Sequence, residues 1–164
     1  MNFIAVLIAA VIPTVVGFIW YNPKTFAPVW MRESGVDEAK IKSSNMVVIF
    51  GVSLLFSFMI ALFEQMIVIH QLHFGSILAM QPDFKEAGSV SSELMKKITE
   101  LYSHSFRTFK HGVFHGVLAS ILFVLPIIGI NALFERRSFK YIMIHFGYWL
   151  VTLGIMGGIL CGME

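Results

Sequence analysis

The sequence has few charges and almost no cysteine, and each scarcity excludes a class of protein. Charged residues make up 13% of the 164 residues and hydrophobic residues 57%, against about 25% and about 45–50% in ordinary soluble domains. A formal net charge of +2 gives no basic field, so no nucleic-acid partner is predicted. The single cysteine, Cys161, cannot form a disulfide within the chain. There is also no nucleotide-binding loop or nucleophile elbow, so no catalytic residue and no cofactor is predicted.

Long apolar runs make up most of what remains. Each is about 19–24 residues long, close to the roughly 20 that a helix needs to cross a bilayer. Nearly every charge falls between them, so we predict an all-α, integral membrane four-helix bundle that forms one domain over residues 1–164, with the lipid bilayer as its surroundings. The predicted spans are about 3–21, 46–69, 113–133 and 141–161.

The loop between the second and third spans is long and has two parts. Residues 71–89 contain two glycines and a proline and are predicted to be irregular. Residues 91–110 alternate apolar and charged positions with helical spacing, which predicts an extra amphipathic helix that continues into the third span. Such a helix would lie on the bilayer surface or pack on the bundle as a connector, and the pattern leaves both open.

Small residues recur at four-residue steps in the spans, which is typical of close helix packing in bilayers. The strongest stripe is in the last span, where it would pack inside one bundle or join two protomers. A homo-oligomer or another membrane protein is therefore a possible partner. We call the small residues of the last span the glycine stripe: Gly147, Gly154, Gly158 and Gly162.

Glu64 is the one acidic residue inside a predicted span. It lies seven residues after Ser57, on the small-residue face, so we expect it to point into the bundle. Ionisable groups within a membrane are costly and usually have a partner or a function. Two interpretations remain: a neutral carboxyl that hydrogen-bonds a neighbouring helix, or a carboxylate that binds an ion, a proton or a substrate.

Histidines gather near the same end of the spans as Glu64. His104, His111 and His115 are spaced by seven and four residues, so they would share one face of a continuous helix. Imidazoles in this pattern can bind zinc, iron or copper, or relay protons. His111 and His115 are thus candidates for ion or substrate binding together with Glu64, and all three histidines are candidates for a metal site.

The first span ends in an aromatic motif formed by Gly17, Trp20, Tyr21, Phe26 and Trp30. Tryptophan and tyrosine are typical of the membrane–water interface, so Trp20, Tyr21 and Trp30 are predicted to lie there. The motif and the closing stretch 145–162 resemble the bacterial membrane family called domain of unknown function 1761. The resemblance implies a four-span protein of the bacterial cytoplasmic membrane and implies no activity.

Basic residues between the spans bear on orientation. Loops 22–45 and 134–140 contain seven and the 71–110 loop contains five, so the positive-inside rule predicts periplasmic termini. The seven are Lys24, Arg32, Lys40, Lys42, Arg136, Arg137 and Lys140, and the five are Lys85, Lys96, Lys97, Arg107 and Lys110.

Three functions are compatible with the sequence. The first is a non-enzymatic structural or complex-forming membrane subunit, which the small-residue stripes favour. The second is a small proton- or ion-coupled transporter or channel-like protein that uses Glu64. The third is a membrane metalloprotein based on the histidines.

Overall fold

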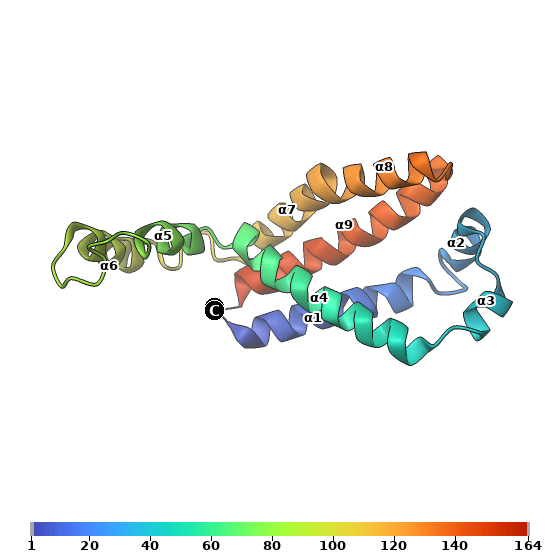
Figure 1. Ribbon diagram of the computed structural model, residues 1–164, viewed down its shortest axis with the longest axis horizontal. Coiled ribbons are helices and arrows are strands. Elements are labelled where there is room, and N and C mark those ends of the chain that lie inside the picture. The colour runs from blue at the N-terminus through green and yellow to red at the C-terminus, as the bar shows by residue number, and fades with distance from the viewer. Residues whose placement is uncertain (1, 164) are drawn as a thin grey trace.

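The computed structural model describes residues 2–163, and its regular elements in that range are all helices (Figure 1). Four segments of 18, 23, 26 and 24 residues are long and apolar enough to cross a bilayer. This confirms the all-α class and the four candidate spans. They are α1 (Phe3–Trp20), α4 (Met46–Val68), the run Phe109–Phe134 and α9 (Phe139–Gly162).

The last span is the central element of the bundle. Helix α9 packs against α1, α4 and α7 (Phe109–Ala119), and its residues Met156 and Leu160 are fully buried. The outer faces of the spans stay apolar, as at Val47, which is 82% exposed. An apolar outer surface of this kind suits contact with lipid tails.

Glycines bring the backbones of α7 and α9 into direct contact. A Cβ atom added at Gly112 would overlap the carbonyl group of Gly157, and one added at Gly116 would overlap that of Leu153. Small residues permit this close approach, which supplies packing energy where lipid offers no hydrophobic gain.

The glycine stripe packs within the chain. Gly147 receives the Trp20 ring, Gly154 faces Val113 and Val117, and Gly158 and Gly162 both face Phe109. Of the two arrangements predicted for the stripe, the structure therefore shows the one inside a single bundle.

The third span is not one regular helix. Between α7 and α8 (Leu125–Phe134) lies a π-helical turn, η1 (Ser120–Val124), where the N–H of Leu125 donates to the carbonyl of Ser120. Pro126 follows directly, in the first turn of α8. A wider turn fits this position because proline has no N–H to donate and its ring crowds the carbonyl four residues earlier.

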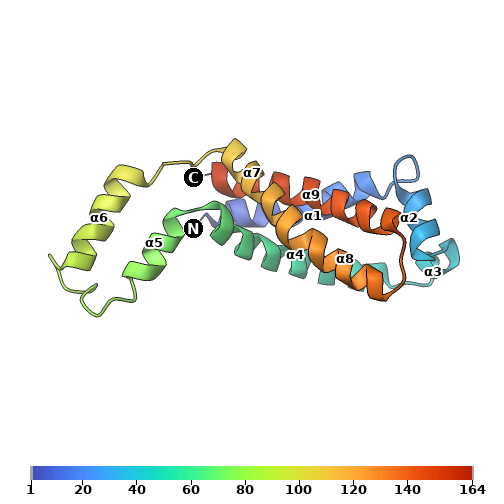
Figure 2. The same cartoon turned by 90° about the horizontal axis from the view of Figure 1, so that it is seen from above.

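The loop between the second and third spans forms a helical hairpin that projects from one end of the bundle (Figures 1 and 2). Its helices are α5 (Gln71–Leu78) and α6 (Val90–Tyr102), and we call residues 71–102 the arm. The prediction that 71–89 is irregular was wrong for its first half. Helix α6 packs on α5 and not against the bundle, so the connector alternative was wrong, while a position on the bilayer surface stays a prediction.

The extra helix predicted in this loop is present as α6, but its predicted extension to residue 110 and into the third span was wrong. Helix α6 ends at Tyr102 and a turn follows, in which Phe106 has a left-handed backbone with φ 61°. Thr108 then begins a new helix by accepting a hydrogen bond from the N–H of His111 through its side chain. A left-handed residue and a fresh N-cap end the helical path that the apolar spacing suggested.

Two short helices, α2 (Ala27–Ser34) and α3 (Glu38–Lys42), lie at the opposite end of the bundle (Figure 2). The hydroxyl of Ser138 donates to Glu33, and Arg137 donates to the carbonyl of Ser34. The Ser138 hydrogen bond, with Arg32 beside it, lowers the pKa of Glu33. These contacts fasten α2 to the turn between α8 and α9. The first residues of α1 and the last of α9 lie at the arm end, as an even number of spans requires.

Candidate functional site

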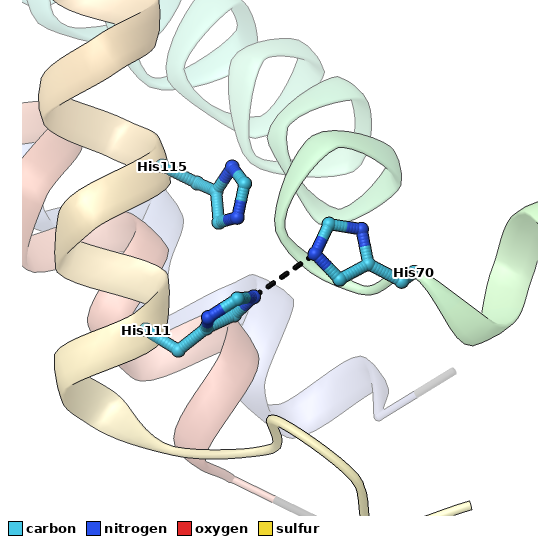
Figure 3. Close-up of side chains that lie close together, drawn as sticks. All are labelled: His70, His111 and His115. Carbon is cyan, nitrogen blue, oxygen red and sulfur yellow. Dashed lines mark hydrogen bonds between the residues drawn. The ribbon is translucent and has the colours of Figure 1, made fainter. Parts of the chain in front are cut away.

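Three histidines meet where the arm joins the spans (Figure 3). His70 lies between α4 and α5, while His111 and His115 lie in the first turns of α7. One ring nitrogen from each lies within 4.8 Å of the others. We call His70, His111 and His115 the histidine cluster.

Local structure places each ring. The Thr108 cap fixes the start of α7, and the four-residue spacing then puts His111 and His115 on one face, one turn apart. On the other side, α4 ends at Val68 and Ile69 adopts an extended conformation. That change of direction brings His70 against α7.

The cluster is compact and half-buried. The Nε2 atoms of His70 and His111 are 3.0 Å apart, within hydrogen-bonding distance. Ring centroids are separated by 5.0 Å for His70–His111, 4.9 Å for His70–His115 and 4.5 Å for His111–His115. Phe106 and Phe114 pack against His111 and His115, which shields the rings from part of the solvent.

This arrangement is close to a metal-binding geometry. In a tetrahedral zinc site, imidazole nitrogens lie about 2.0–2.1 Å from the ion, so any two are about 3.3 Å apart. The His70–His111 separation is already near that value, and small side-chain rotations would bring His115 into place. Among residues 2–163, the cluster holds three ligand side chains and no fourth. Three protein ligands and one open position are typical of reactive rather than purely structural zinc sites.

The structure differs from the sequence-based metal hypothesis in one ligand. His111 and His115 come together as expected, but the break at 103–108 places His104 outside the cluster, and His70 takes the third position. His70 lies about 40 residues before His111, so helical spacing along one segment cannot connect it to the other two. Its place at the end of the second span, on the membrane face shared by the other histidines, is the signal that points to it.

Glu64 points into the bundle, as the sequence suggested. Its side chain is 2% exposed and neither oxygen has a hydrogen-bond partner within residues 2–163. Cβ atoms added at Gly116 and Gly157 would lie 3.0 and 3.1 Å from its Oε1 atom, so the carboxyl occupies the notch made by the α7–α9 glycines. The hydrogen bond to a neighbouring helix, which was one of its two interpretations, is absent among these residues.

Gln65 is fully buried beside Glu64 in sequence, and its amide atoms also have no partner in the described part of the chain. A buried polar group without a partner costs about 1–3 kcal/mol. Glutamine in an apolar run was the signal available for it.

The aromatic motif lies at the other end of the bundle and points inward as well as marking the span end. The Trp20 indole N–H donates to the carbonyl of Ile144 at 3.1 Å, and the hydroxyl of Tyr21 lies 3.1 Å from Nδ1 of His145. Trp30 packs edge-on against Tyr21.

Gly17, the first residue of the motif, lies beside the Tyr148 ring, whose hydroxyl donates to the carbonyl of Pro13. These contacts fasten the end of α1 to α9.

Fold and site together define a multi-pass helical membrane protein with a histidine cluster at one end of its spans. A family model described as "Protein of unknown function (DUF1761)" matches residues 4–161, so the chain belongs to the DUF1761 family. No curated protein and no solved structure matches it.

Proposed function

We propose that this protein binds a transition-metal ion, with Zn²⁺ as the best match, at the end of its membrane spans. The observation that carries the proposal is the convergence of His70, His111 and His115, with ligand nitrogens within 4.8 Å of one another. Neutral imidazole suits zinc, copper and nickel, whereas calcium and magnesium prefer oxygen ligands. The open position would bind water or a ligand of an incoming molecule.

This proposal takes precedence over the structural subunit that the sequence favoured. The subunit hypothesis was motivated by the small-residue stripes, and the strongest of these is now occupied by Trp20, Val113, Val117 and Phe109 of the same chain. Those glycines need no partner helix to explain them. Complex formation with a second copy or another membrane protein stays a proposal without a defined surface.

Metal content tests the proposal directly. Protein purified in detergent through a tag free of histidine, stripped with a chelator and titrated with Zn²⁺ should bind one ion per chain. Protons compete with the metal for imidazole, so binding should weaken as the pH is lowered. Zinc that binds no better than it does to empty micelles would end the proposal.

For location, we propose the bacterial cytoplasmic membrane with both termini and the arm in the periplasm, on the basis of the loop charges. The histidine cluster would then face the periplasm. A cysteine introduced at exposed Lys97 should react with a membrane-impermeant maleimide in intact spheroplasts, because the arm would face the periplasm. The native Cys161 is buried, so it should add little background labelling. Labelling only after lysis would show that the arm faces the cytoplasm.

A second candidate function, ion-coupled transport through Glu64, is favoured by the two unpartnered carboxyl oxygens inside the bundle. An ionisable group inside a membrane span is costly and usually has a partner or a function. The unpartnered carboxyl of Glu64 would gain a partner when it binds an ion or a proton. Glu64→Gln keeps the shape and removes the acid, so we expect it to abolish ion flux into proteoliposomes while zinc binding stays within about twofold. Glu64→Asp is the matched control that retains a carboxyl. Equal flux in the wild type and Glu64→Gln would exclude this role.

A further inference from the structure

The arm is a unit of its own. Helices α5 and α6 pack on each other, with Gly75 beside Met95. The intervening loop is fastened to α6 by Asp83, which accepts hydrogen bonds from the side chain and backbone of Ser91. These bonds lower the pKa of Asp83, so the fastening is present at neutral pH. Figures 1 and 2 show the hairpin projecting beyond the end of the spans.

Two short connections join the arm to the bundle. The first is Ile69–His70, where the chain leaves α4 in an extended conformation before α5 begins. The second is the turn over 103–108, which leads into α7. Both connections are anchored on the bundle side: Arg107 donates to the carbonyls of Cys161 and Met163 in and after α9, and Leu72 packs against the core beside Ile69. On the arm side of these anchors the contacts include exposed hydrogen bonds, such as that between the His73 ring and the carbonyl of Met66. Water competes with exposed hydrogen bonds, so these add little restraint of their own.

The histidine cluster lies across both connections. His70 is part of the connection between α4 and α5. His111 and His115 lie in the first two turns of α7, directly after the 103–108 turn. A metal ion bound to all three would join the α4–α5 junction to α7 through rigid coordination bonds. Without the ion, His70 is held to α7 by one hydrogen bond, at 3.0 Å to His111.

We infer that metal binding at the histidine cluster fixes the arm relative to the spans, so that the arm reports whether the site is loaded. The inference rests on the proposed metal-binding function and adds a mechanical consequence to it. Coordination favours the arrangements in which the three rings converge and thereby removes other arm positions from the ensemble. A partner that recognises the arm would then distinguish loaded from empty protein.

Spin-label distances test this inference. Nitroxides would be placed on cysteines introduced at Lys97 of α6 and Leu122 of the third span, both exposed, while buried Cys161 stays unlabelled. In detergent, one equivalent of Zn²⁺ should narrow the Lys97–Leu122 distance distribution about twofold. The same addition should leave the distribution of the His111→Ala protein unchanged.

Two comparisons separate this inference from the function on which it rests. Two glycines inserted after His70 keep all three ligands but free the arm, so zinc should still bind while the narrowing is lost. Zinc that binds to the wild type without narrowing the distribution would overturn the inference and leave the metal site standing. Equal narrowing in the His111→Ala protein would also overturn it, whereas failure of zinc to bind at all would remove both.

Discussion

His111→Ala is expected to weaken zinc binding by about a hundredfold or more. Even indirect partners of a metal ligand typically contribute 10- to 100-fold in affinity, so loss of one of three direct ligands should reach at least the upper end of that range. His111 is also central to the cluster, since it is hydrogen-bonded to His70 and its ring centroid lies 4.5 Å from that of His115. Two remaining imidazoles would bind zinc only weakly.

Calorimetric titration of chelator-stripped protein in detergent would measure this loss. His104→Ala is the matched control, because it removes a histidine from the neighbouring turn that lies outside the cluster. It should keep the wild-type affinity within about twofold, as expected for a site that shares no ligand with the cluster.

Combined variants sharpen the result. Ligands of one ion act as a unit, so His70→Ala added to His111→Ala should cost much less than the two separate losses together. Unchanged affinity in both single variants, or a His104→Ala protein as impaired as His111→Ala, would contradict zinc binding at the histidine cluster.

The spans could be predicted from sequence because their cause is local. A run of about 20 apolar residues must become a helix in a bilayer, where no water satisfies its backbone. The start of the third span was placed at 113 instead of 109 because Lys110 and His111 interrupt the apolar run, whereas the helix begins at its Thr108 cap. Length and polarity locate a span, and capping decides its ends.

The second helix of the arm could be predicted from its spacing, but the hairpin and the cluster could not, because both depend on contacts distant in sequence. Helix α5 contains Gly75, which argues against a helix by propensity, yet that glycine lies against Met95 of α6. The cluster needs the whole segment 71–108 to fold back so that His70 reaches α7. No periodicity along one helix contains that information, so spacing alone predicts His104 as the third ligand where the structure has His70.

The packing glycines were predicted in part, for a related reason. The four-residue stripe of α9 identified a small-residue face, but Gly157 lies outside that spacing and makes the closest approach to α7. Which side of a glycine-rich helix meets its neighbour depends on the crossing geometry of the two helices.

Gly112→Ala is expected to destabilise the bundle by about 3 kcal/mol, at the upper end of the usual range for overpacking. The added methyl group would overlap the carbonyl of Gly157, and a helix backbone cannot move aside as a flexible side chain can. Thermal unfolding in detergent should therefore occur at a clearly lower temperature. Gly129→Ala is the matched control, because no atom beyond its own stretch of helix lies within 4 Å of a Cβ there, and it should be neutral or stabilising by up to about 1 kcal/mol.

The same substitution also connects packing to the proposed site. His111 precedes Gly112 directly and His115 follows one turn later, so separating α7 from α9 would move two of the three ligands away from His70. Gly112→Ala should therefore lower zinc affinity even under conditions where the protein stays folded, whereas Gly129→Ala should not. If the Gly112→Ala protein unfolds at the wild-type temperature, the α7–α9 contact does not have the close backbone packing described above.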